Sequence, residues 1–162
     1  MDFYKKKNQL DKALEIFRKI VGLDPENVNY RQRFAEFCEQ AGRKGEAALA
    51  YADTAEVALR RGDAAAAEAA LQKAAGFDPQ SQRVHLLRAR LASRKKDWGQ
   101  VEKVLDSVPA LKATPEGRQL LLEAYVASQK LEAAEKLVGE VFSANPGDFS
   151  PLASYATMCA ER

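Results

Sequence analysis

Apolar and polar positions along the chain follow the period of an α-helix. A small residue followed four positions later by a large apolar residue recurs at five places: Ala13/Phe17, Ala47/Tyr51, Ala67/Leu71, Val101/Leu105 and Ala134/Val138. The first members of these pairs are separated by 34, 20, 34 and 33 residues. No segment shows the two-residue alternation of a half-buried strand. A period of about 34 residues is typical of a two-helix repeat, so the pattern predicts an all-α chain of stacked helix pairs.

Proline and glycine predict where the helices end. Pro25, Pro79 and Pro146 each stop a helix, because proline lacks the amide donor and disfavours helix in the residue before it. Gly42 and Gly62 mark tight turns within helix pairs. These signals predict about nine helices. They are expected at residues 8–22, 27–41, 44–61, 63–76, 81–95, 97–107, 115–128, 131–144 and 149–161.

The pattern resembles the tetratricopeptide repeat over nearly all of the 162 residues. The first-helix half of that motif is clearest in three segments: Phe34-Ala35-x-x-Cys38, Tyr51-x-x-Thr54-Ala55-x-x-Ala58 and Leu152-x-x-Tyr155-Ala156-x-x-Cys159. The small/large pairs form the second-helix half, and Lys96 and Gln129 replace the family's turn glycines. The resemblance implies an antiparallel helix-pair solenoid that coils into a right-handed superhelix. First helices of this family line a concave groove that accepts a peptide.

One interval of 20 residues falls about one helix short of the repeat. The helix at 44–61 closes the preceding repeat through Ala47 and Tyr51, and it opens the next repeat through Tyr51, Ala55 and Ala58. We therefore expect one solenoid over residues 1–162 with a kink or repeat irregularity at 44–62. An ordinary merged helix without a functional role is the alternative. Because both terminal repeats are incomplete, the chain is expected to be a segment of a longer protein.

Composition and charge narrow the possible functions. A net charge of +2 argues against wholesale attraction to nucleic acid or to a membrane surface. No apolar run reaches the roughly 20 residues that span a bilayer. We find no phosphate loop, no nucleophile elbow and no metal-ligand spacing, and His85 is the single histidine, so we predict no enzyme, no cofactor and no metal. Cys38 and Cys159 are expected to be buried and unpaired, which favours a reducing compartment and makes the cytoplasm the default location.

Three arginines on the predicted helix 81–95 are candidate binding residues. Arg83, Arg90 and Arg94 are spaced by seven and four positions, so they fall within about 40° of one another around the helix. The resemblance places them on the groove, and on the next inner helix it adds Glu116, Gln119 and Glu123. Arginine pairs bidentately with carboxylates and phosphates, so the stripe predicts an acidic peptide as ligand. A solvated face that neutralises itself is the alternative.

These patterns predict a non-catalytic protein–protein interaction scaffold that binds a peptide or partner protein on its concave face. The alternative is a structural module that joins other domains or self-associates through the C-terminal helix, where Leu152, Tyr155 and Cys159 form an apolar stripe. RNA binding is disfavoured, because no polar pair recurs in each repeat. Gln32 and Glu36 occupy places where some members of the family bind a chain terminus with lysine and asparagine, so that clamp is not expected.

Overall fold

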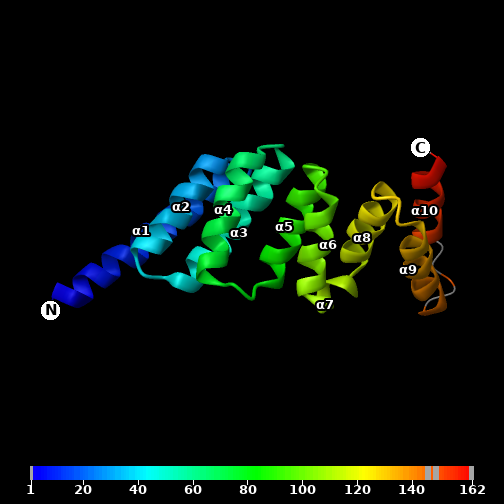
Figure 1. Ribbon diagram of the computed structural model, residues 1–162. Coiled ribbons are helices and arrows are strands. Elements are labelled where there is room, and N and C mark those ends of the chain that lie inside the picture. Colours follow the sequence, from blue (N-terminus) through cyan, green and yellow to red (C-terminus); the bar gives the residue numbers. More distant parts are fainter. Residues whose placement is uncertain (1, 145–146, 148–149, 161–162) are drawn as a thin grey trace. The chain divides into compact units, whose positions relative to one another are not determined.

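The computed structural model describes residues 2–144, 147 and 150–160, with side chains from residue 9 onward. Within these residues every regular element is a helix and none is a strand (Figure 1). The expected all-α architecture of paired helices is therefore confirmed. The chain separates into two compact units, Met1–Leu87 and Arg88–Arg162. The boundary falls within α5 (Gln82–Arg94).

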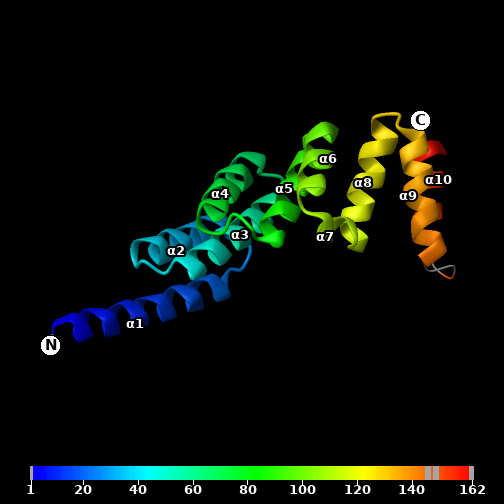
Figure 2. The same cartoon turned by 60° about the horizontal axis from the view of Figure 1, so that its bottom comes forward.

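The first unit contains α1 (Asp2–Leu23), α2 (Val28–Gln40), α3 (Lys44–Arg60) and α4 (Ala64–Phe77). The central helix is α3, which packs against both α2 and α4 (Figure 2). Ten of its 17 residues are buried, and six of those ten are alanines. Because alanine has a small side chain and a high helix propensity, α3 is stable as a helix and lets both neighbours approach closely.

The second unit contains α6 (Trp98–Ser107), α7 (Pro109–Lys112), α8 (Pro115–Ala127), α9 (Leu131–Ala144) and α10 (Ser150–Ala160). Within it, α8 packs against α6, α7 and α9, and α10 packs against both α8 and α9. The one-turn helix α7 was not expected. Pro109 prevents α6 from continuing, but its fixed φ suits the first turn of a new helix.

The start of the first helix differs from expectation. The first helix begins at Asp2 and not at residue 8, because no glycine or proline interrupts residues 2–8. Residues 149 and 161, the expected limits of the last helix, lie outside the described residues, as does Pro146.

Four turns between helices have the same backbone conformation. Gly42, Gly62, Lys96 and Gln129 have φ values of 71°, 78°, 58° and 58°. In each turn the next amide donates to the carbonyl five residues earlier, at 2.8–2.9 Å, as in a Schellman motif. Lys96 and Gln129 therefore stand at turn-glycine positions, as the resemblance implied. A left-handed conformation costs these two residues about 1–2 kcal/mol each, a cost that glycine avoids.

Four of the five repeated small/large pairs lie in the core. The small members of four pairs have no exposed surface: Ala47, Ala67, Val101 and Ala134. Leu71, Leu105 and Val138 are buried as expected. Phe17, the large member of the first pair, is only half-buried, as is Trp98. Because α1 packs chiefly against α2, the Phe17 ring instead contacts Phe37, with ring centroids 5.1 Å apart.

Candidate partner-binding site

The first predicted arginine, Arg83, lies in the first unit and contacts α3. Its Nη2 atom is 2.7 Å from Asp53 Oδ1 and 2.5 Å from Glu56 Oε2. Burial lowers the pKa of the Arg83 guanidinium, but the hydrogen bonds to Glu56 and Asp53 outweigh it and raise the pKa. The charge of Arg83 is therefore already compensated by carboxylates of the protein itself.

The other predicted residues lie in the second unit. Arg90 donates to both carboxylate oxygens of Glu116, and the bond from Nη2 is 2.7 Å long. Gln119 Nε2 donates to Glu123 Oε1 at 3.2 Å. Arg94 has no hydrogen bond or ion pair with the residues that the structure describes. Two of the three arginines thus meet the protein's own carboxylates, and partner binding by these residues stays a prediction.

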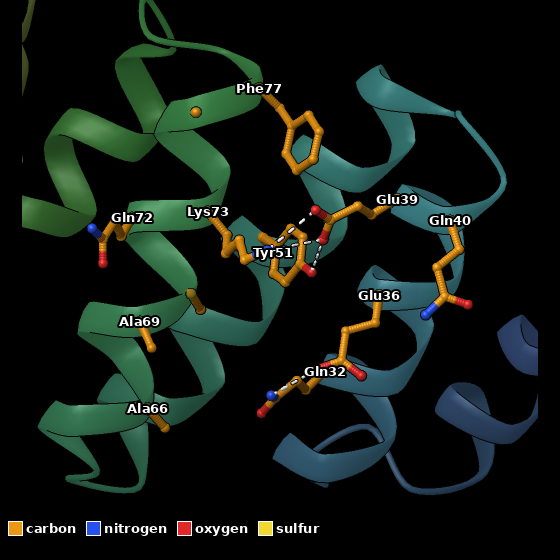
Figure 3. A pocket seen from close by; sticks show the side chains of 12 residues that line it. Gln32, Glu36, Glu39, Gln40, Tyr51, Ala66, Ala69, Gln72, Lys73 and Phe77 are labelled. Carbon is orange, nitrogen blue, oxygen red and sulfur yellow. Dashed lines mark hydrogen bonds and ion pairs between the residues drawn. The ribbon is translucent and has the colours of Figure 1, made fainter.

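A groove opens between α2 and α4 in the first unit, with α3 along its floor (Figure 3). Its volume is about 930 Å³. The α2 wall carries Gln32, Glu36, Glu39 and Gln40. The α4 wall carries Ala66, Ala69, Ala70, Gln72, Lys73, Gly76 and Phe77. Tyr51 of α3 completes the lining. One wall is therefore polar, and the other is built largely from small residues.

A hydrogen-bonded cluster links the three helices across this groove (Figure 3). The Tyr51 hydroxyl donates to Glu39 Oε2 at 2.6 Å, and Lys73 Nζ donates to both Glu39 oxygens at 3.1 and 3.3 Å. The hydrogen bonds from Tyr51 and Lys73 lower the pKa of Glu39, whereas burial and the Glu39 carboxylate raise the pKa of Tyr51. The Tyr51 ring also stacks on Phe77, with centroids 6.1 Å apart. The cluster holds α2 and α4 to the floor and compensates the charges of Glu39 and Lys73.

Glu36 lies on the same wall without a cationic partner. Its Oε1 atom accepts a hydrogen bond from the neutral Gln32 amide at 3.0 Å. In the described part of the chain, neither lysine nor arginine forms an ion pair with it. Because Glu39 and Lys73 cancel, the formal charge of the lining is the single negative charge of Glu36.

Sequence patterns did not reveal this groove. Tyr51 was interpreted as a residue that closes one repeat and opens the next, and Gln32 and Glu36 were considered only as a failed match to a chain-terminus clamp. The available signal was the 20-residue interval. Because α3 packs against both α2 and α4, these two helices form opposite walls of one groove.

The remaining candidate features carry little chemistry. Nowhere in the described residues do three potential metal ligands cluster, and no described helix combines the length and apolarity needed to cross a membrane. His85 Nε2 lies 3.0 Å from the carbonyl oxygen of Pro79. On α10, Tyr155 packs against the α8–α9 core, but Leu152 is exposed. Cys159 is exposed as well, which corrects the expected burial, because it lies on the solvent side of α10.

Comparisons with known proteins agree with this architecture. Two models described as tetratricopeptide repeat match residues 2–27 and 58–121, which together are more than half of the chain. A search of curated proteins returned no significant match. A tetratricopeptide repeat protein from Parabacteroides merdae has a similar structure, with a TM-score of 0.59 and 14% identity over 96% of this chain and 68% of that chain. A thermophilic tetratricopeptide repeat protein from Thermus thermophilus has a TM-score of 0.57 and 21% identity, over 97% and 94% of the two chains.

Proposed function

Because the chain belongs to the tetratricopeptide repeat family, we propose that it is a non-catalytic scaffold that binds a segment of a partner protein in the α2–α4 groove. Repeats of this family generally mediate protein–protein interactions. The observation that carries the proposal is the groove itself. It is an open concavity walled by amides, carboxylates and alanines, with no nucleophile and general base arranged for chemistry.

The composition of the walls favours a protein segment over a small molecule. Small-molecule sites occupy about 300–1,000 Å³ and are enclosed mostly by apolar and aromatic side chains. The α2–α4 groove has a suitable volume, but Tyr51 and Phe77 are its only aromatic lining residues. Most of its other side chains are polar or no larger than alanine. An open groove lined by polar and small side chains suits a partner that contributes its own side chains and main chain.

The predicted arginines remain a second proposed contact surface. An acidic peptide that bound Arg83 or Arg90 would compete with Glu56 or Glu116, because both guanidinium groups already engage carboxylates. Arg94 could accept a partner without losing a contact to a described residue. Self-association through Leu152 is the alternative proposal, supported by the exposed surface of that side chain.

A pull-down with two matched tryptophan variants tests the groove. Ala69→Trp fills the space beside α2, whereas Ala65→Trp adds the same side chain to an exposed position of α4 outside the lining. Both variants should keep the helical circular dichroism spectrum. Proteins retained from a lysate of the source cells by the wild-type chain and by Ala65→Trp should be lost with Ala69→Trp.

Arg94→Gln and Leu152→Ser serve as comparisons in the same experiment. Partners that persist with Ala69→Trp but disappear with Arg94→Gln would move the binding surface to the predicted arginines. If the mass measured by light scattering rises with protein concentration for the wild-type chain and for every variant except Leu152→Ser, self-association would be supported instead. Either result would overturn the groove as the binding surface.

A further inference from the structure

The α2–α4 groove carries a more specific inference, which rests on the proposed function of that groove. We propose that it binds an extended segment of a partner protein and that a lysine or arginine of this segment pairs with Glu36.

The amide side chains of the groove favour an extended ligand over a helical one. Gln32 and Gln40 lie on the α2 wall, and Gln72 lies at the edge of the α4 wall with its side chain turned away from α2 (Figure 3). A glutamine side-chain amide both donates and accepts hydrogen bonds. A helix satisfies its own backbone groups, so it gains little from such amides. An extended chain presents unpaired N–H and C=O groups along both edges. Gln32 and Gln40 therefore match the main chain of an extended segment that lies along the α2 wall.

Small residues on the opposite wall let that main chain come close. Ala66 and Ala69 face the α2 wall across the groove (Figure 3). A side chain no longer than a methyl group keeps the α4 backbone within reach of a second backbone, where larger residues would hold the ligand away. The α2 wall extends from Gln32 to Gln40, which is about 12 Å at about 1.5 Å per helical residue. At about 3.3 Å per extended residue, this length accommodates about four residues of the ligand.

The charge of the groove selects a basic ligand. Lys73 donates to both oxygens of Glu39, and Glu39 also accepts from Tyr51, so neither charge is available without breaking the cluster. Glu36 accepts a hydrogen bond from the neutral amide of Gln32, and it forms no ion pair with a lysine or arginine among the described residues. A cationic side chain placed beside Glu36 would gain a charge-assisted hydrogen bond at no cost to an existing ion pair. A carboxylate in the same place would meet uncompensated negative charge.

This ligand class differs from the one that the sequence predicted. The arginine stripe predicted an acidic peptide on a wall of first helices. The α2–α4 groove is formed by one first helix and one second helix around a shared floor, and its net charge is negative. The irregular repeat thus creates a surface of opposite preference.

A peptide-display library of random twelve-residue sequences can be used to identify the peptides that bind the groove. Selection is carried out in parallel on the wild-type chain and on Glu36→Lys, Ala69→Trp and Ala65→Trp, with circular dichroism to show that each variant is folded. Peptides enriched on the wild-type chain should carry lysine or arginine at one position within a run of about four residues, without the spacing of an amphipathic helix. Selection on Glu36→Lys should enrich aspartate or glutamate at that position.

Binding of a synthetic enriched peptide then measures the pair directly. Glu36→Gln should lower the affinity for this peptide about five- to tenfold and make the affinity less dependent on salt. Replacing the basic residue of the peptide by a neutral one should lower the affinity of the wild-type chain by the same factor, but it should not change the affinity of Glu36→Gln. Peptides bind through the groove if their binding is lost with Ala69→Trp but not with Ala65→Trp. If such peptides lack a basic residue, or if their apolar residues have helical spacing, this inference is wrong and the proposed function still stands. Peptides that bind Ala69→Trp as well as the wild type, or a library with no enrichment, would overturn the inference and count against the groove as a binding surface.

Discussion

Gly117 provides a sharp test of the packing in the second unit. Glycine normally weakens a helix, so replacing an internal glycine by alanine stabilises it by about 1 kcal/mol. Gly117 lies in the first turn of α8, where its amide donates to the Thr114 hydroxyl oxygen at 3.0 Å. A Cβ atom there would lie 2.8 Å from the carbonyl carbon of Leu111 and would penetrate its carbonyl oxygen. We therefore expect Gly117→Ala to destabilise the protein.

The expected loss of stability in Gly117→Ala depends on which atoms must move to make room for the new methyl group. The obstacle is the backbone at the end of α7, so no side-chain rotation can relieve the overlap. Overpacking of this kind costs about 1–3 kcal/mol, and disturbing the Thr114 cap costs about 1 kcal/mol more. After subtraction of the gain in helix propensity, Gly117→Ala should lower the free energy of unfolding by about 1–3 kcal/mol.

Gly139 is the matched control. It lies within α9, it is exposed, and a Cβ atom there would meet nothing within 4 Å. Gly139→Ala should therefore stabilise the protein by up to about 1 kcal/mol. Denaturant unfolding followed by circular dichroism measures both changes, and thermal melts should shift by about 2–4 °C for each kcal/mol. A Gly117→Ala protein as stable as the wild type, alongside a stabilised Gly139→Ala protein, would refute the close approach of α7 to α8.

Two further predictions concern a thiol and a carboxylate. Cys159 is exposed, whereas Cys38 is fully buried and burial raises the pKa of its thiol. A thiol reagent at about pH 8 should therefore label Cys159 rapidly and Cys38 only after unfolding. Equal labelling rates of the two cysteines in the native protein would contradict this placement. The pKa of Glu39 is lowered by hydrogen bonds from Tyr51 and Lys73, so its stabilising contribution is present above the ordinary value of 4.5 and is lost as the pH falls through the lowered value. Glu39→Gln should therefore lose less Tm than the wild type between about pH 7 and about pH 3, and identical losses would argue against the cluster.

The helices could be predicted because their signals are local. Ala67 and Leu71 lie four positions apart on one helix face, so their burial follows from the period of that helix alone. The resemblance to the repeat family implied that Lys96 and Gln129 lie at turn positions, and both have the positive φ of such turns. Phe17 has the same spacing but is only half-buried, because the burial of a residue on α1 depends on how many helices surround that helix and not on periodicity alone.

The candidate site was less predictable, because it depends on residues that are distant in the sequence. The arginine spacing on α5 was correct, but the carboxylates that meet Arg83 and Arg90 come 27 and 26 positions away in the chain. Glu39 and Lys73 are 34 positions apart, and their contact across the groove depends on α3 lying between their helices. No local pattern records such a distance.

The sequence by itself determined the all-α architecture, most of the helix limits and the small/large pairs of the core, since each of these is specified within one helix or one turn. Only the tertiary structure decided which charges are compensated, and why Gly117 and Gly139 should respond in opposite ways to the same substitution. It also showed that the shared helix α3 opens a negatively charged groove between α2 and α4. These properties arise from the approach of separate helices, where a few ångströms decide between an ion pair, a clash and an open surface.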